Sequence, residues 1–156
     1  MQKISPFLWF ETEAEDAANF YVSIFKNSRI AKVARYSDAG PGPKGSVMTV
    51  GFELEGQTFT ALNGGPMFKF NEAISFVVDC TTQVEVDHYW DHLLEGGTAQ
   101  QCGWLKDRYG LSWQIVPRVL VDLLSGSDPA KAGRVMQAMF GMVKLDSTKL
   151  LQAAEG

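Results

Sequence analysis

The chain has 156 residues, of which 46% are hydrophobic, and it carries a formal net charge of −4 with a pI near 5.1. This length and composition predict one compact domain with its own core and exclude an intrinsically disordered chain. The acidic balance, without any basic run, excludes a typical nucleic-acid-binding surface, so we expect no nucleic-acid partner.

No apolar stretch is long enough to span a membrane, and the N-terminal residues lack the charged and apolar regions of a signal peptide. We therefore expect a cytoplasmic protein with no membrane partner. In a reducing compartment Cys80 and Cys102 are expected to be free thiols. Cys80 closes an apolar strand and is expected to be buried. For Cys102, packing is favoured over a nucleophilic role because no histidine lies near it in the sequence.

The first predicted element is a strand at Ile4–Phe10. Thr12 and Glu15 follow with the spacing of a capping box, in which the hydroxyl and the carboxylate each satisfy an otherwise unpaired backbone N–H. The helix that they begin carries the pairs Phe20-Tyr21 and Ile24-Phe25 and is predicted to end at Asn27-Ser28.

Three more strands are predicted after this helix, at Ile30–Tyr36, Ser46–Leu54 and Gln57–Asn63. A Gly-Pro-rich loop at residues 39–43 separates the first two strands. Glu55-Gly56 forms a tight turn between the last two, which indicates a hairpin. Gly64-Gly65-Pro66 then begins a linker that also contains Phe68 and Phe70.

The same pattern then occurs a second time. A strand at Ile74–Asp79 precedes Thr82 and Glu85, and Thr82 lies 70 residues after Thr12. The second helix carries Tyr89-Trp90 and Leu93-Leu94 and stops at Gly96-Gly97. Shorter strands are predicted at Thr98–Cys102, Trp104–Lys106 and Ser112–Pro117. Two similar caps, helix stripes and preceding strands indicate an internal repeat.

A third section begins after Pro117. Asp128-Pro129 predicts a helix start, with the aspartate as N-cap and the proline in the first turn. One apolar face follows at helical spacing, and we expect it to be core or interface: Ala132, Val135, Met136, Met139, Phe140 and Val143. The predicted fold class is therefore α+β, a single domain over residues 1–156 with β-α-β-β-β modules at 3–63 and 73–117 and a helical extension at 118–156.

Several segments of the chain together resemble one known family. They are Ile4–Phe10, Phe20-Tyr21 with Ile24–Lys26, Leu62–Pro66, Ile74–Phe76, Cys102–Gly110, Ser112–Gln114 and Met142–Asp146. The repeated module resembles the vicinal oxygen chelate fold, also called the glyoxalase/bleomycin-resistance/dioxygenase fold. Within that fold the chain is most similar to the PhnB-like group, which is often labelled 3-demethylubiquinone 3-methyltransferase-like.

The resemblance implies that the two sheets enclose a pocket, and that metal-dependent relatives place four ligands, mostly His and Glu, on its concave side. Those positions correspond here to Ser5 or Pro6, Thr60, Ala73 and Gln114. Gln114 is assigned because Asp107–Gly110 resembles the Asp-x-x-Gly turn that precedes the ligand glutamate in relatives. None of these residues offers an imidazole or a carboxylate, so we expect no tightly held zinc, nickel or iron and no cofactor.

Strand alternation assigns each residue to one face of its sheet. Ile74, Phe76 and Val78 are predicted to pack beneath the second helix, and Ala73 and Val77 to face the pocket. The predicted ligand-contacting residues are Phe7, Trp9, Thr60, Leu62, Ser75, Trp104, Ser112 and Gln114. Such a mixture of small, polar and aromatic residues is typical of a ligand cavity, which we favour. The alternative is that the small residues make room for the protein's own aromatics, including Phe68 and Phe70.

Other motifs are weaker candidates. His88 and His92 have metal-chelating spacing but lie opposite the apolar stripe of their helix, so a solvated face is favoured. Lys106 and Arg108 offer cations near the pocket for an anionic substrate, although a turn shaped by Asp107 and Arg108 is preferred. No G-x-G-x-x-G sequence follows a strand, so a Rossmann-type S-adenosylmethionine or dinucleotide site is not supported.

Three functions are compatible with these observations. The first is a metal-free protein that binds or sequesters a small, partly aromatic molecule, as the drug-sequestering members of the fold do. The second is an enzyme without a tightly held metal, in which Gln114 and Thr60 orient a small aromatic or quinone-like substrate. The third is the methyltransferase activity of the family label. The pocket face itself supplies no general base, although Cys102 or Tyr109 could reach into it, and this favours binding over chemistry. A homodimer is also expected, because such sheets have open edges and the extension has an apolar face to bury.

Overall fold

The computed structural model describes residues 2–156, and the chain divides after Phe70 into two compact units. Each unit contains a four-stranded sheet with a helix on one face, and the second unit also contains three C-terminal helices. The two predicted β-α-β-β-β modules and the α+β class are confirmed. None of the helices within residues 2–156 combines the length and the apolar character that a membrane span requires.

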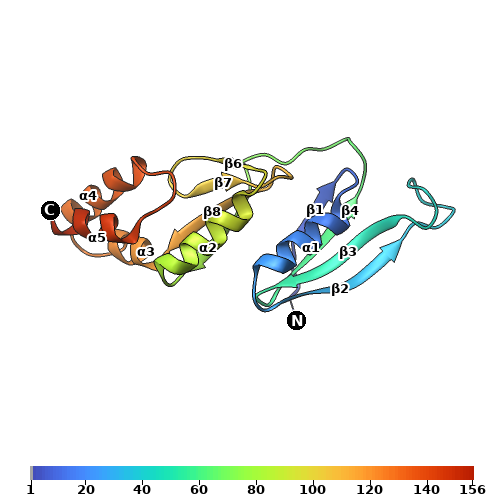
Figure 1. Ribbon diagram of the computed structural model, residues 1–156, viewed down its shortest axis with the longest axis horizontal. Coiled ribbons are helices and arrows are strands. Elements are labelled where there is room, and N and C mark those ends of the chain that lie inside the picture. The colour runs from blue at the N-terminus through green and yellow to red at the C-terminus, as the bar shows by residue number, and fades with distance from the viewer. Residues whose placement is uncertain (1) are drawn as a thin grey trace. The chain divides into compact units, whose positions relative to one another are not determined.

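The first unit consists of β1 (Phe7–Phe10), α1 (Ala14–Ile24), β2 (Ser28–Arg35), β3 (Val47–Leu54) and β4 (Gln57–Asn63). The strand order is β1-β4-β3-β2, with β1 parallel to β4 and the other pairs antiparallel. Helix α1 lies over one face of this sheet (Figure 1). The opposite face carries no helix of this unit within residues 2–70.

The core of the first unit lies between α1 and its sheet. Small helix residues, including Ala17 and Ala18, are fully buried and allow the helix to approach the strands closely. The rings of Tyr21, Phe52 and Phe59 stack in succession, with centroids 6.1 Å and 5.2 Å apart. The period-2 alternation therefore places Phe59 and Ala61 of β4 beneath the helix and Thr60 and Leu62 on the other face.

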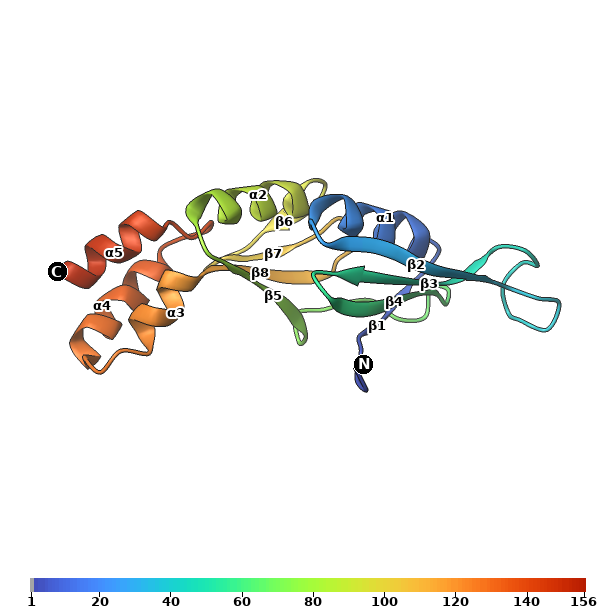
Figure 2. The ribbon, with the colours of Figure 1, turned by 90° about the horizontal axis from the view of Figure 1, so that it is seen from below.

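The second unit repeats this arrangement with β5 (Ser75–Cys80), α2 (Gln83–Leu94), β6 (Thr98–Ala99), β7 (Trp104–Lys106) and β8 (Ser112–Pro117). Its strand order is β5-β8-β7-β6. Trp113, Ile115 and Leu105 are buried, as expected for residues beneath α2. Figure 2 shows α2 on one side of this sheet. The other side of the sheet is its open face, and it carries the residues that alternate with the buried ones.

The C-terminal extension folds into α3 (Arg118–Leu124), α4 (Pro129–Phe140) and α5 (Ser147–Glu155). Asp128 caps α4 through the N–H groups of Ala130 and Lys131, as predicted, and Asp146 caps α5. These helices and the loop before α5 share a separate hydrophobic cluster, to which the loop contributes Leu145 and the helices contribute Leu120, Val135, Leu150 and Ala154.

Several predicted boundaries were wrong. Helix α1 begins at Ala14, its N-cap is Glu13 without a side-chain bond, and Thr12 does not form the predicted capping box. The carboxamide Oδ1 of Asn63 instead accepts a 2.8 Å hydrogen bond from the Ala14 N–H. In the second module Thr82 does cap α2, accepting from the Glu85 N–H, and Glu85 accepts from the N–H of Thr81.

The strand starts and the α4 stripe also differ from the predictions. Residues 71–74 form a turn in which Asn71 Oδ1 accepts from the Ala73 N–H, and β5 therefore begins only at Ser75. Ile74 is therefore 70% exposed rather than packed beneath α2, and Ala73 precedes the strand. Strand β1 begins at Phe7, and β6 covers only two residues. Helix α4 ends at Phe140, which is itself exposed, so Val143 lies beyond the helix.

Candidate functional site

The open face of the second sheet contains the position that the resemblance assigns to a metal ligand. Gln114 on β8 lies opposite Val77 on β5 and Trp104 on β7. Its Nε2 donates a 2.9 Å hydrogen bond to Ser75 Oγ. The amide is therefore fixed within the sheet face by a neighbouring strand, and its two register partners, Val77 and Trp104, are uncharged.

Ser112 lies one step along the same face of β8. It is 0% exposed, and its Oγ has no hydrogen-bond partner within residues 2–156. In the sheet register it lies opposite Ser75 on β5 and Lys106 on β7. The structure thus brings together Ser75, Ser112, Gln114 and Trp104, four of the predicted ligand-contacting residues.

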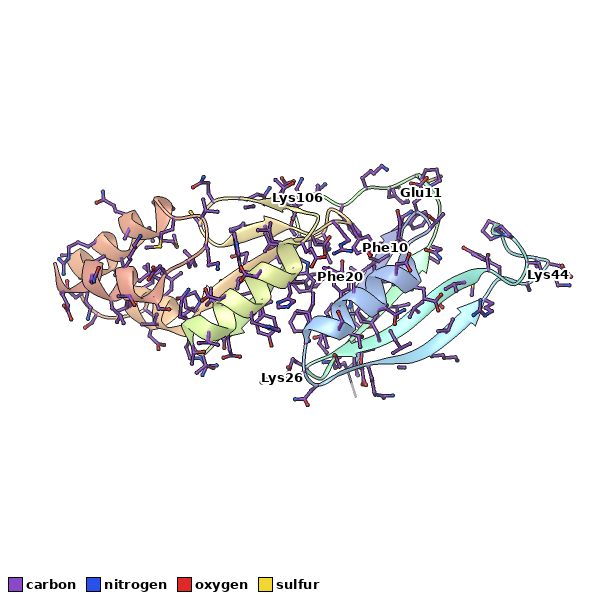
Figure 3. All side chains as sticks on the ribbon, viewed as in Figure 1. Phe10, Glu11, Phe20, Lys26, Lys44 and Lys106 are labelled. Carbon is purple, nitrogen blue, oxygen red and sulfur yellow. The ribbon has the colours of Figure 1, made fainter. Side chains whose placement is uncertain are left out.

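An ion pair adjoins this group. Lys106 Nζ lies 3.0 Å from Glu72 Oε2, and Gln100 Nε2 donates to the same oxygen at 3.3 Å. The hydrogen bond from Lys106 lowers the pKa of Glu72 below its usual value. Both side chains are partly exposed, with fractions of 32% for Lys106 and 49% for Glu72. Figure 3 labels Lys106 on β7.

Asp107 shapes the turn that precedes β8. The residue is 3% exposed, and its carboxylate accepts from the N–H groups of Tyr109 and Leu111 and from Trp113 Nε1, at 2.8, 3.1 and 2.9 Å. Arg108 bonds the carbonyl oxygen of Glu95. The interpretation of residues 107–108 as turn-forming is therefore confirmed, and this turn sets which residues of β8 point to the open face.

The open face of the first sheet contains Phe7, Trp9, Thr60 and Leu62, which pair along β1 and β4. Phe7 is 61% exposed. Trp9 instead contacts its own loop: Nε1 donates to the Gly65 carbonyl oxygen at 2.9 Å, and the Phe68 ring lies edge-on at 4.8 Å. Phe68 therefore covers part of this face, as the self-filling alternative expects.

The chemistry of the predicted ligand positions does not fit a tightly bound transition metal. Thr60 and Gln114 are neutral oxygen donors, Ala73 has no donor side chain, and Ser5 lies before β1. No group of three or more His, Cys, Asp or Glu side chains within residues 2–156 is arranged for a metal ion. His92 Nδ1 donates to the His88 carbonyl oxygen at 2.7 Å, so one of its ring nitrogens is used within the helix.

The first unit also contains a hollow that sequence reasoning missed. It has a volume of about 500 Å³ and lies between the start of α1, the β2–β3 loop and the end of β4. Tyr36 donates to the Asn63 carbonyl oxygen at 2.5 Å, and the loop backbone at Gly40 and Gly42 packs against its ring. Three acidic residues, Glu11, Glu15 and Asp16, are among those that line it. None of the eight predicted ligand-contacting residues lines this hollow. The sequence features that could have indicated this hollow are the Gly-Pro loop and Gly64-Gly65, which line it.

Two β-α-β-β-β modules with these open faces define a protein of the vicinal oxygen chelate class. A family model described as 3-demethylubiquinone-9 3-methyltransferase matches residues 2–116. The chain belongs to this PhnB-like family. Helices α3, α4 and α5 lie after the last matched residue.

Solved structures agree with this assignment. A PhnB protein from Bacillus cereus, described as a candidate 3-demethylubiquinone-9 3-methyltransferase, is 38% identical, with a TM-score of 0.69 over 74% of this chain and 99% of that one. Protein PA1353 from Pseudomonas aeruginosa is 19% identical, with a TM-score of 0.62 over 75% and 98% of the two chains, and shows the fold alone. No protein with a curated description matches the chain.

Proposed function

We propose that this protein binds a small, partly aromatic molecule on the open face of its sheets, without a tightly held metal ion. The main support for this proposal is the hydrogen bond between Gln114 and Ser75. This bond fixes an amide at the position where, by the family resemblance, metal-dependent relatives have a carboxylate ligand. Trp104 and Val77 flank this amide and offer apolar surface, with Val77 59% exposed. Apolar walls with a few fixed polar groups are the usual composition of a small-molecule site.

The test is a titration of the full chain with small aromatic and quinone-like compounds, followed by quenching of tryptophan fluorescence. The proposal expects saturable quenching without turnover, and loss of saturation in Val77→Glu, which places a negative charge on the open face. The matched control is Val33→Glu, another exposed strand valine, on β2 of the first unit. If no compound quenches saturably, or if both variants behave alike, the proposal is wrong.

Catalysis is the second candidate. The family description and the Bacillus cereus relative support methylation of a 3-demethylubiquinone-like substrate. Calorimetric binding of S-adenosylmethionine would support this activity, and loss of turnover in Gln114→Ala with an unchanged melting temperature would support any enzyme that uses the amide to orient its substrate. Methylation ranks behind binding, because neither four-stranded sheet within residues 2–156 carries a Gly-rich loop of the Rossmann type for a methyl donor.

A homodimer remains part of this proposal. Met136 and Phe140 lie one helical turn apart on α4 and are 41% and 59% exposed, and apolar surface of this kind favours association. Light scattering at micromolar concentration is expected to give twice the monomer mass, and Phe140→Glu is expected to shift the mass toward the monomer. A monomeric wild type would contradict this part.

A further inference from the structure

The buried hydroxyl of Ser112 belongs to a row of hydrogen-bond donors. The register places Ser75, Ser112 and Lys106 side by side on β5, β8 and β7. Ser75 Oγ accepts a hydrogen bond from Gln114, so the Ser75 hydroxyl proton is not used in that bond and can be donated to another group. The row therefore offers two hydroxyl protons and one ammonium group from three adjacent strands.

The orphaned hydroxyl points to a ligand. A buried hydroxyl without a partner destabilises a fold, and native proteins keep few of them. Ser112 Oγ has no partner within residues 2–156, although an alanine would fill nearly the same space. A polar group of a bound molecule would satisfy it.

The ion pair indicates which kind of group that is. Strand β8 lies between β5 and β7, so the pair that joins Glu72, three residues before β5, to Lys106 on β7 crosses the face of β8 near Ser112. The Glu72 carboxylate is thus an anionic oxygen group already held at the end of the row. Glu72 is half exposed and belongs to a turn, so a competing anion can replace its carboxylate as the partner of Lys106.

We infer that Ser75, Ser112 and Lys106 bind an anionic oxygen group of the ligand, which is a carboxylate or a phosphate. In the free protein Glu72 is the ion-pair partner of Lys106, and the ligand displaces it. This inference rests on the proposed function and names the ligand class of the same face. Charge-assisted hydrogen bonds from an ammonium and two hydroxyls match the several lone pairs of such a group.

The experiment compares benzoate, phenyl phosphate and the neutral isostere benzamide by isothermal titration calorimetry on the full chain at low ionic strength. We expect at least one of the two anions to bind about tenfold more tightly than benzamide, since hydrogen bonds to charged groups are the stronger class. Preference for benzoate or for phenyl phosphate distinguishes the carboxylate from the phosphate. If benzamide binds as tightly as both anions, the inference is overturned and the proposed function stands. If none of the three binds at millimolar concentration, both are overturned.

Variants of Lys106 and Glu72, with a control at Lys144, locate the anion. Lys106→Met is expected to lower anion affinity about tenfold and leave benzamide unchanged. Lys144→Met is the control, because Lys144 is 33% exposed and also paired with carboxylates, those of Asp87 and Asp91. Glu72→Gln removes the competing carboxylate and is expected to tighten anion binding. An equal effect of the two lysine variants, or no gain in Glu72→Gln, overturns the inference.

Ser112→Ala separates a binding role from a structural one. Removal of an unpaired buried hydroxyl is expected to leave the melting temperature unchanged or raise it, while anion affinity falls several-fold. A lower melting temperature with unchanged affinity overturns the role of Ser112. This variant and Glu72→Gln keep the inference testable if Lys106→Met does not fold.

Discussion

Asn63 at the end of β4 accepts a hydrogen bond from the backbone N–H of Ala14, the first residue of α1, at 2.8 Å. Its Nδ2 donates to the Val47 carbonyl oxygen at 3.1 Å, so one carboxamide joins the helix start to two strands. A residue 49 positions away thus satisfies an N–H that the local sequence leaves unpaired. The stability of the first unit therefore depends in part on a contact between residues distant in the sequence.

Asn63→Ala is expected to lower the free energy of unfolding by about 1–2 kcal/mol, because the α1 N-terminus loses its side-chain acceptor and Val47 loses a donor. Urea denaturation measures this change. Thr12→Ala is the matched control and is expected to be nearly neutral, since Thr12 makes no cap. A larger loss in Thr12→Ala would contradict the assignment of the cap to Asn63.

Asp107→Asn is expected to cost about 2–3 kcal/mol of unfolding free energy, although it is nearly isosteric. In the variant, the asparagine oxygen can still accept from the backbone N–H groups of Tyr109 and Leu111. The asparagine NH₂ group then faces the indole N–H of Trp113, so two hydrogen-bond donors oppose each other in a buried site. Asp146→Asn provides the comparison. Asp146 caps α5 through one N–H, and asparagine caps as well as aspartate, so a change within about 0.5 kcal/mol is expected.

Gly64→Ala is expected to disturb Trp9. A Cβ at Gly64 would overlap the indole ring, so the ring must move and its hydrogen bond to Gly65 must break. Overpacking of this kind costs about 1–3 kcal/mol, and the tryptophan emission spectrum should change with it. Gly51→Ala is the control, because its Cβ would meet no atom closer than 3.8 Å. Similar emission spectra of the two variants would argue against the Trp9 contact.

The protein is expected to lose stability as the pH rises from about 9 toward 12 because of Cys80. Desolvation, assisted by the charges of Glu85 and Asp79, raises the pKa of the Cys80 thiol from 9.0 to about 12. In this window the unfolded chain releases the thiol proton and the folded chain retains it, so unfolding becomes more favourable with increasing pH.

Urea denaturation between pH 9 and pH 11 measures this slope. Cys80→Ala should flatten it, whatever its effect on the absolute stability. An unchanged slope in Cys80→Ala would mean that another group dominates the alkaline loss.

Local patterns predicted the elements of this fold well where neighbouring residues in the chain settle the geometry. The Glu55-Gly56 turn has φ values of 48° and 83°, as a two-residue hairpin requires, and β4, β7 and β8 have the predicted bounds. The caps of α2 and α4 were predicted correctly because each hydroxyl or carboxylate reaches an N–H within three residues. The start of β5 was predicted too early, because the turn that Asn71 begins by accepting from the Ala73 N–H was not recognised in the sequence.

The sequence by itself determined that the chain repeats one module twice, that the strands alternate between two faces, and that an amide lies where relatives have a carboxylate. The repeat and the alternation follow from periodicity, which depends only on residue order, and the place of the amide follows from the family resemblance of the residues around it. Only the tertiary structure decided that Asn63 caps α1, that Gln114 bonds Ser75, and that Ser112 is buried without a partner beside Lys106. Gln114 and Ser112 meet Ser75 because β5 and β8, which are distant in the chain, pair in one register, and burial of one face of each strand fixes that register. Asn63 reaches Ala14 because α1 packs on the sheet that contains β4.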